Sequence, residues 1–352
     1  MSITIITVNY HTESFLPALL ESLTEQITIE AWIIVDNSGT FENSLSAAFP
    51  IRIISQKNNP GYAKAVNLAV RYVNTRWALL VNPDALLLPG MVQLLREAAV
   101  QFSAPVSGPR FFWDNACRFR MPPAPGDHPW LATALIGASQ HFTEAYTLDH
   151  YWQLRHDHFW RQTTPFYEPF LSGACLLLDL QWFENNSEPV FDDRFFLYYE
   201  DTDLCMRLLQ HQIQPLCVPE AQMVHYYNQS PAPASKKQQL MAQARAQFYQ
   251  KHFGTVPAQC SISIAKPASE PALLGKFQHS PEFTIEKESN GPLYFEISHN
   301  PWFIPFIQTQ TRGNTPIILP DEVWQQLEPG RYYTRLRHPT LGTQKTWQWN
   351  KI

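Results

Sequence analysis

The chain has 352 residues, of which 45% are hydrophobic and 16% are charged, and its formal net charge is −5. This size and composition predict a globular protein with one large and one smaller domain, and they argue against a disordered chain. The acidic balance provides no basic surface for nucleic acid, so a role in nucleic-acid binding is disfavoured.

The cysteines and the N-terminus indicate a cytoplasmic protein. The five cysteines are an odd number without a Cys-x-x-Cys pair, which disfavours both a disulfide framework and a zinc site. Residues 1–10 lack the basic start of a signal peptide, and no apolar run reaches the ~18 residues of a membrane span. We expect no transmembrane segment, and peripheral attachment to the inner face of the cytoplasmic membrane stays open.

Short apolar runs alternate with helical patterns through the first hundred residues. The runs predict buried strands at 3–8, 32–35, 51–54 and 77–81. Helical spacing is found at 13–25, up to 47, from the turn at 59–61 to 74, and at 91–102. Because strands that alternate with helices form parallel sheets with right-handed crossovers, we predict a doubly wound α/β domain with helices on both faces.

The pattern is less regular between 106 and 253. We expect an edge strand at 106–112, an excursion over the site at 121–169, strands at 170–178 and 213–218, and helices at 203–210 and 238–253. The excursion carries five histidines, which more often indicate surface positions than catalytic ones: His128, His141, His150, His156 and His158.

The C-terminal part has a different character. Apolar and polar residues alternate between Pro and Gly turns after residue 282, which is typical of a small antiparallel β domain. We predict an α/β domain at 1–255, a proline-rich linker at 256–281 and a β domain of unknown role at 282–352. Four tryptophans of the tail either stack on sugars or fill its core, and the core is favoured: Trp302, Trp324, Trp347 and Trp349.

Two of the predicted strands end in an aspartate. Asp36 follows the strand at 32–35, and Asp84 follows the strand at 77–81. Ligands of open α/β sheets bind beyond the carboxyl ends of the strands, so both carboxylates lie where a ligand is expected. The Asp-Asn-Ser-Gly sequence at Asp36 is also good turn chemistry, and the turn remains an alternative there.

The turn at Asn59 and Gly61 leads into a helix. A helix start needs a cap and a permissive backbone, which is the structural interpretation of these two residues. The functional interpretation is that Gly61 lets the backbone approach a ligand while the helix N-terminus faces a phosphate. Neither a Gly-x-Gly-x-x-Gly fingerprint nor a P-loop is present.

Further acidic residues suggest metal-assisted group transfer. Asp84 beside a phosphate-facing helix suits Mg²⁺ or Mn²⁺, which would neutralise a departing diphosphate. Glu200 and Asp201 are candidate bases for the attacking hydroxyl, although acids in a first helical turn also stabilise the helix dipole. His225 could complete the metal site through a neutral imidazole, or it could be structural.

Several motifs together resemble the family 2 glycosyltransferases, in particular the rhamnosyltransferase-like branch. The resemblance covers roughly residues 2–253. It is carried by Thr7-Val-Asn-Tyr10, Val35-Asp-Asn-Ser38, Asn59-Pro-Gly-Tyr-Ala-Lys-Ala-Val-Asn67, Asn82-Pro-Asp84, Ser172-Gly-Ala-Cys175, the run from Phe195 to Arg207, and His225. It implies a GT-A fold and an inverting, metal-dependent transfer of a sugar from a nucleoside diphosphate.

The resemblance also assigns roles to individual residues. Asp84 would bind the metal with His225 as a further ligand, Asp201 would be the general base, and Glu200 would support it or contact the acceptor. The nucleotide would be lined by Asp36, which holds its base, and by Thr7, Asn9, Tyr10, Asn59, Gly61, Lys64, Asn67 and Asn82. Asn82 replaces the first acid of the family's Asp-x-Asp motif, which leaves one carboxylate fewer for the metal.

The expected reaction transfers L-rhamnose from dTDP-L-rhamnose to a hydroxyl of a glycan, lipid-linked or protein-linked acceptor, in the synthesis of a bacterial surface polysaccharide or glycoconjugate. One alternative is a UDP-sugar donor, UDP-galactose or UDP-N-acetylglucosamine. A second alternative is a catalytically silent sugar- or protein-binding scaffold whose working part is the β tail. A homo-oligomer stays open, and the tail after about residue 255 has no family match.

Overall fold

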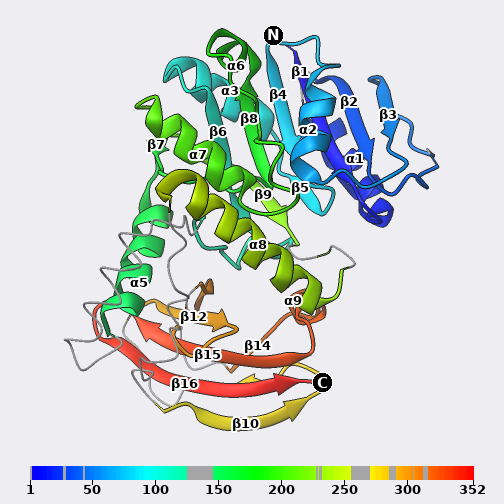
Figure 1. The fold of residues 1–352 in the computed structure, drawn as a ribbon. Coiled ribbons are helices and arrows are strands. Elements are labelled where there is room, and N and C mark those ends of the chain that lie inside the picture. The colour runs from blue at the N-terminus through cyan, green and yellow to red at the C-terminus, as the bar shows by residue number, and fades with distance from the viewer. Residues whose placement is uncertain are drawn as a thin grey trace. The chain divides into compact units, whose positions relative to one another are not determined.

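The computed structural model describes residues 2–26, 29–42, 44–124, 146–226, 229, 232–254, 270–284, 291–303, 305–311 and 316–352. The chain divides into two compact units (Figure 1). The N-terminal unit is formed by Met1–Phe111 with Gln162–Ala258, and the C-terminal unit by Phe112–Arg161 with Gln259–Ile352.

The elements follow one another in this order. As far as residue 112 they are β1 (Ile3–Asn9), η1 (Glu13–Phe15), α1 (Leu16–Thr24), β2 (Ile29–Asp36), β3 (Ile51–Ser55), α2 (Tyr62–Val70), β4 (Trp77–Val81), β5 (Ala85–Leu87), α3 (Met91–Gln101) and β6 (Val106–Phe112). From 146 to 253 they are α5 (Tyr146–Arg161), β7 (Phe166–Tyr167), β8 (Cys175–Asp179), α6 (Leu180–Asn185), α7 (Glu200–Gln210), β9 (Leu216–His225) and α8 (Ala234–Phe253). The remaining elements are β10 (Ala272–Phe277), β11 (Glu282–Phe283), β12 (Leu293–Ser298), β13 (Ile307–Thr311), β14 (Ile317–Ile318), α9 (Asp321–Gln326), β15 (Gly330–His338) and β16 (Gly342–Lys351).

The central sheet of the N-terminal unit has the strand order β3-β2-β1-β4-β8-β6-β9-β5, and β7 pairs with β9. Strands β3, β2, β1 and β4 run parallel to one another, whereas β8 is antiparallel to β4. The predicted mostly parallel α/β sheet is thereby confirmed. The expectation of an edge strand at 106–112 is wrong, because β6 lies inside the sheet between β8 and β9.

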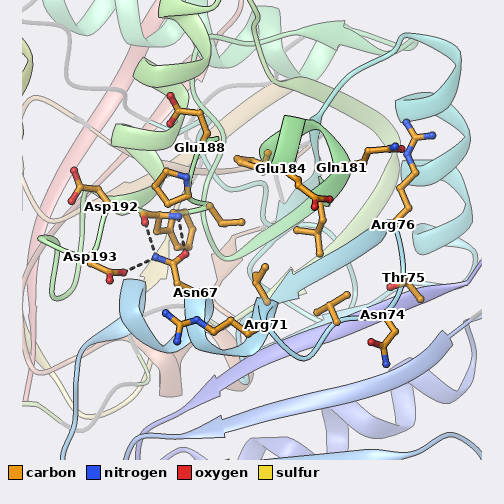
Figure 2. Close-up of a pocket in the computed structure, with 17 residues that line it drawn as sticks. Asn67, Arg71, Asn74, Thr75, Arg76, Gln181, Glu184, Glu188, Asp192 and Asp193 are labelled. Atoms are coloured by element: carbon orange, nitrogen blue, oxygen red, sulfur yellow. Dashed lines mark hydrogen bonds between the residues drawn. The ribbon is translucent and has the colours of Figure 1, made fainter. Parts of the chain in front are cut away.

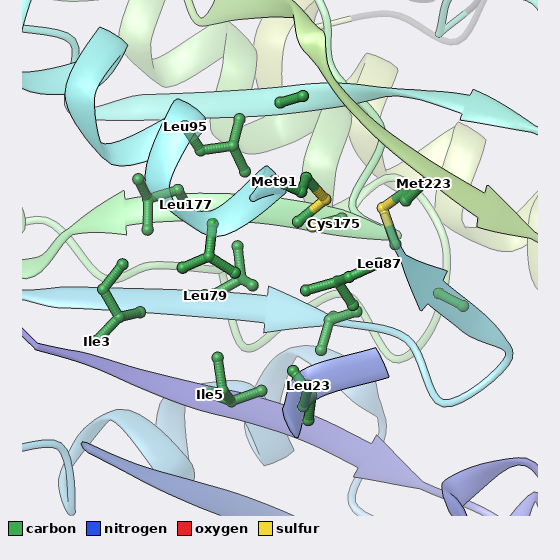
Figure 3. Close-up of a cluster of buried hydrophobic side chains, with 14 of the residues drawn as sticks. Ile3, Ile5, Leu23, Leu79, Leu87, Met91, Leu95, Cys175, Leu177 and Met223 are labelled. Atoms are coloured by element: carbon green, nitrogen blue, oxygen red, sulfur yellow. The ribbon is translucent and has the colours of Figure 1, made fainter. Parts of the chain in front are cut away.

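Both faces of this sheet are covered, as its continuous apolar strands require. All seven residues of β1 are buried. Alternate side chains such as Ile3 and Ile5 pack with Leu23 of α1 and with Met91 and Leu95 of α3 (Figure 3). Helix α2 packs on β1 and β2 and has no residue in that cluster, so it covers the opposite face. The helices on the two faces of the sheet hold the parallel strands so that their carboxyl ends lie together at one end of the sheet.

Two elements differ from the sequence-based prediction. No described residue between β2 and β3 is helical, although a helix through Ala47 was expected. The Asp36 side chain accepts hydrogen bonds from the backbone N–H groups of Ser38 and Phe41, which holds this segment in a turn instead. Strand β9 continues to His225, beyond the predicted end at Val218, although it contains Pro219.

The C-terminal unit is built on a sheet with the order β10-β16-β15-β12-β13. Its pairs are antiparallel except for β10 and β16, which are parallel. Trp324, Trp347 and Trp349 are buried in its core, as favoured above, and Trp302 is half-buried.

The extent of this unit differs from our division of the sequence. It includes 112–161, which we had assigned to the α/β domain, because Trp113 and Phe119 belong to its core. Strand β10 occupies 272–277 of the expected linker, whose residues 256–269 lie outside the described ranges.

The excursion is described only in part. His128 and His141 lie outside the described residues, whereas His150 is exposed. The expectation of a surface position is wrong for His156, which is fully buried against the ring of Phe306 and has no hydrogen-bond partner on either nitrogen. Burial lowers the pKa of His156 to about 4, so the ring is neutral near pH 7.

Within the described part of the chain, none of the helices combines the length and the apolar character that a membrane crossing requires. The four described cysteines are all free, and Cys260 lies outside the described residues.

Candidate active site

Asp84 and His225 lie side by side although 140 positions separate them in the sequence. Strand β4 ends at Val81, and the Asn82-Pro83-Asp84 turn leads into β5, which pairs antiparallel with the end of β9. This pairing places Ala85 opposite His225. The His225 Nε2 atom is 3.4 Å from the Asp84 Oδ1 atom, and both side chains are buried. The ladder therefore fixes the two residues that were expected to bind a metal.

The chemistry of this pair fits a partial divalent-cation site. Burial alone would raise the pKa of Asp84, but the charge and the hydrogen bond of His225 lower it below its usual value. The 3.4 Å separation is close to the roughly 3 Å edge of an octahedron around Mg²⁺. No set of three or more His, Cys, Asp or Glu residues suited to a metal is found among the described residues. The other ligands would therefore be phosphate oxygens and water, as is usual for Mg²⁺.

Asp201 lies in the first turn of α7 and is held by three donors. The Gly173 N–H donates to Oδ2 at 2.8 Å, while the N–H and hydroxyl of Thr202 donate to Oδ1 at 2.6 and 3.2 Å. A side chain at Gly173 would begin 3.1 Å from the Asp201 Cβ atom, so this approach requires glycine. Burial raises the pKa of Asp201 despite these hydrogen bonds. Asp201 is thus an oriented carboxylate that is more basic than usual.

Glu200 is the neighbouring acid and has a different environment. Its side chain is buried, and its Oε2 atom has no hydrogen-bond partner. Burial and the adjacent charge of Asp201 raise the pKa of Glu200 to about 8. The two residues before it, Tyr198 and Tyr199, have φ angles of 73° and 66°, which is a strained conformation for side chains of this size. Glu200, with a buried Oε2 atom that lacks a partner, thus adds to a site that is held at a cost in stability.

A Glu200→Gln variant should therefore be more stable than the unchanged protein at alkaline pH. The folded state keeps a proton on Glu200 that the unfolded state has lost, so the stability decreases as the pH rises from about 4.5 to about 8. The neutral glutamine removes this loss, and we expect a gain of about 2–4 kcal/mol at pH 8 and little gain at pH 5.

Urea unfolding at the two pH values measures the effect, with the exposed Glu184→Gln as the matched control. Equal pH slopes for the unchanged protein and Glu200→Gln would contradict the assignment.

Tyr62 joins the two acidic groups. Its hydroxyl lies 3.0 Å from Asn82 Oδ1 and 3.3 Å from the Gly173 carbonyl oxygen. Its pKa is raised well above the usual value by burial and by the charges of Glu200, Asp201 and Asp84, among others. The Tyr62 hydroxyl thus connects the turn that contains Asp84 with the loop whose Gly173 N–H holds Asp201. The sequence-based hypothesis that Asp84 and Asp201 act on one ligand stays a prediction. That hypothesis gave no role to Tyr62 or Gly173, although both belong to the quoted motifs.

A second group of predicted residues meets at the ends of β1 and β2. Asp36 Oδ1 accepts from Asn9 Nδ2 at 2.9 Å and from the Ser38 hydroxyl at 2.6 Å, and Oδ2 accepts from the Phe41 N–H. Thr7 accepts from the indole of Trp32. Burial would raise the pKa of Asp36, but these hydrogen bonds lower it. The turn role of Asp36 is confirmed. Its side chain is fully buried, and a contact with the nucleotide base stays a prediction. The fourth residue of this group, Tyr10, is partly exposed.

The turn before α2 is closed by another loop. Gly61 has a φ angle of 94°, and a Cβ atom there would lie 2.6 Å from the carbonyl oxygen of Phe196. The same carbonyl accepts the Tyr62 N–H at 2.7 Å, and Asn59 Oδ1 accepts the Gly61 N–H. The glycine is thus explained by the approach of Phe196, and a nucleotide contact at Gly61 stays a prediction. Lys64 is exposed on α2.

Asn67 does not join the site. Its amide nitrogen donates to the Phe191 carbonyl and to Asp193, and its amide oxygen accepts the Phe191 N–H. It contributes to a cavity of about 900 Å³ between α2 and the segment that follows α6 (Figure 2). None of Asp84, Glu200, Asp201 or His225 lines this cavity. Asn67 therefore positions the loop that leads to α7.

Asp203, the third acid of the α7 sequence, is structural. It is fully buried and forms ion pairs with Arg207 in its own helix and with Lys251 and His252 of α8. Two of the three acids therefore remain for chemistry.

A strand-end carboxylate paired with a histidine, and a second, oriented carboxylate at a helix start, suit an α/β enzyme for group transfer. Residues 2–174 match the family described as Glycosyl transferase family 2. Residues 2–174 of the chain thus belong to the family 2 glycosyltransferases, as the resemblance predicted. Its mostly parallel sheet has the GT-A fold, to which a separate strand-rich unit is added.

Two relatives illustrate this similarity. An N-acetylglucosaminyl-diphospho-decaprenol L-rhamnosyltransferase of Mycobacterium tuberculosis is 26% identical over 240 residues, which are 61% of this chain and 72% of the relative. An uncharacterized glycosyltransferase of Haemophilus influenzae is 30% identical over 90 residues, which are 25% of this chain and 31% of that protein.

Solved structures show more distant similarity. The mannosyltransferase PcManGT from Pyrobaculum calidifontis, in complex with GDP-Man and Mn²⁺, has a TM-score of 0.44 and 13% identity. The match covers 71% of this chain and 63% of the mannosyltransferase. Residues 1–349 of S. aureus TarS have a TM-score of 0.43 and 12% identity, with 72% and 73% of the two chains covered.

Proposed function

We propose that this protein is an inverting, metal-dependent glycosyltransferase that moves L-rhamnose from dTDP-L-rhamnose to a hydroxyl of a glycan acceptor. The observation that supports the proposal is that the Tyr62 hydroxyl contacts both the turn that contains Asp84 and the loop that orients the Asp201 carboxylate. A cation site and a base within one pocket are the two requirements of such a transfer.

In this proposal Asp84 and His225 act on the departing diphosphate, and Asp201 acts on the acceptor hydroxyl. Asp84 and His225 would hold Mg²⁺ or Mn²⁺, and the bound ion would supply positive charge to neutralise the departing diphosphate. Asp201 accepts the proton of the acceptor hydroxyl. The oxygen of that hydroxyl forms the bond to the anomeric carbon, and the bond from this carbon to the diphosphate breaks. Attack opposite to the leaving group inverts the anomeric configuration. Gly173 and Thr202 keep Asp201 oriented through their hydrogen bonds.

The other end of the site suits the nucleotide. Asp36 would offer its Oδ2 atom to an N–H of the base, while Asn9 and the Phe41 N–H hold its carboxylate in place. Tyr10 is exposed enough to cover the base. Lys64, Asn59 and Asn82 flank the ribose and the phosphates.

The donor and acceptor classes are supported by a relative. The name of the Mycobacterium tuberculosis protein specifies an L-rhamnosyl group and a lipid diphosphate-linked sugar. We extend this to a dTDP-L-rhamnose donor and a lipid-linked acceptor on the cytoplasmic side of the membrane, to which the enzyme attaches peripherally.

A donor panel tests the function. The purified chain is incubated with dTDP-L-rhamnose, UDP-galactose or UDP-N-acetylglucosamine, with Mn²⁺, Mg²⁺ or EDTA, and the nucleoside diphosphate released is measured. We expect release from dTDP-L-rhamnose that stops with EDTA, and a product with inverted anomeric configuration by NMR. Release from a UDP-sugar alone would replace the donor, and the absence of metal-dependent nucleotide affinity would favour the silent scaffold.

A further inference from the structure

Tyr62 contacts two neighbouring segments of the candidate site. It is the first residue of α2, and its ring lies 6.0 Å from that of Phe191. Its hydroxyl lies 3.0 Å from Asn82 Oδ1, in the turn after β4, and 3.3 Å from the Gly173 carbonyl oxygen, in the loop before β8. The Asn82 N–H also donates to the carbonyl of Ala174 at 2.9 Å, so the turn and the loop are joined twice.

These two contacts lead to the two functional carboxylates. Asn82 is two positions before Asp84, in the same turn. The Gly173 carbonyl oxygen shares the single Tyr62 hydroxyl proton with Asn82 Oδ1, and the Gly173 N–H donates to Asp201 Oδ2 at 2.8 Å. A displacement of Gly173 would therefore also move the N–H group that donates to Asp201. The phenol stays protonated, because burial and the surrounding acids raise its pKa.

The contact also determines what Asn82 can offer to a ligand. Its amide oxygen is engaged by the Tyr62 hydroxyl, and no partner for its amide nitrogen is found among the described residues. The amide nitrogen is a hydrogen-bond donor and cannot bind a cation. A phosphate oxygen is the natural acceptor for it.

We propose that Tyr62 is a positioning residue that ties the amide of Asn82, facing the donor diphosphate, to the Gly173 peptide that orients the base Asp201. The inference rests on the proposed function, because it assigns the diphosphate and the base to the two sides of this site. It adds a direct connection between donor binding and the base: the contact that fixes Asn82 also fixes the peptide that holds Asp201.

The first test is Tyr62→Phe, with Tyr72→Phe as the matched control, because Tyr72 is on the surface just after the same helix. We expect kcat to fall about three- to tenfold, the effect of one lost hydrogen bond, with a smaller change in the KM of the donor. The acid limb of the kcat pH profile should move to higher pH, since a loosened Gly173 N–H stabilises the Asp201 carboxylate less.

A double-mutant cycle with Asn82→Ala isolates the connection. Both single variants remove the same hydrogen bond, so the double variant should lose clearly less than the product of the two single losses. Asn82→Ala also tests the contact from its other side if Tyr62→Phe is unstable in thermal unfolding.

The outcomes separate this inference from the proposed function. Multiplicative losses in the cycle, or an unmoved acid limb in Tyr62→Phe, would overturn the role of Tyr62 while the transfer by the unchanged enzyme stands. Loss of activity through KM alone would also overturn it. If the unchanged chain shows no metal-dependent nucleotide binding at all, both proposals fall.

Discussion

An Asp201→Asn variant should transfer sugar about 10²–10⁴-fold more slowly than the unchanged enzyme, which is the contribution of a positioned general base. The amide keeps the size of the side chain but cannot take the proton of the acceptor hydroxyl. Donor binding should be little changed, because the cation and the diphosphate lie on the Asp84 side of the site. The measurements are kcat with dTDP-L-rhamnose and the dissociation constant of the nucleotide in the presence of Mn²⁺.

A modest loss of stability has to be separated from the loss of chemistry. Asp201 accepts from Gly173 with one oxygen and from Thr202 with the other, whereas an amide has a single oxygen. The variant therefore loses one hydrogen bond, at a cost of about 1 kcal/mol, which thermal unfolding will register. Asp193→Asn is the matched control, because it keeps an acceptor for Asn67 outside the site. Turnover of Asp201→Asn near that of Asp193→Asn would remove Asp201 from its assigned role.

The periodicity of the sequence was sufficient for the fold of the N-terminal unit. Apolar runs at 3–8 and 77–81 identify β1 and β4, and their ends correctly place Asp84 at the ligand edge of the sheet. The same local information could not give the position of β6 in the sheet. Its sequence contains glycine and proline, and such a strand is compatible with an edge or an interior position until its neighbours are known. Strand order is a property of long-range pairing, and one sequence gives no direct signal for it.

The site was predictable where motifs are local and unpredictable where distant segments meet. Asp201 could be identified as a candidate base because it begins a helix beside Glu200, but the role of Gly173 depends on its contact 28 residues away. Gly61 was interpreted as making room for a ligand, and the structure fills that room with Phe196. Asp203 was one of three equivalent acids in the sequence, and only α8 distinguishes it, by supplying Lys251 and His252.

The second large effect is expected at Asp84. An Asp84→Asn variant should lose metal-dependent affinity for the nucleoside diphosphate by more than about 100-fold, since even outer-shell changes at metal sites cost 10–100-fold. His225 would remain as the one side chain of the pair able to bind the cation, and a neutral amide is a weak ligand for Mg²⁺ or Mn²⁺. Titration calorimetry with the nucleoside diphosphate, with and without Mn²⁺, measures this loss, and a high Mn²⁺ concentration should restore part of it.

The control for this variant is Asp179→Asn. Asp179 lies opposite Trp77 in the β4–β8 ladder, at the end of these strands that is away from Asp84. Its side chain forms an ion pair with Arg76. The Asp179→Asn variant should bind the nucleotide with unchanged metal dependence, even if its free energy of unfolding falls. If Asp84→Asn instead keeps the full Mn²⁺ dependence, the cation is held elsewhere, and the proximity of Asp84 to His225 serves only to close β5 onto β9. In that case Asp201 would still be a base, but the diphosphate would have to be neutralised by side chains other than this pair.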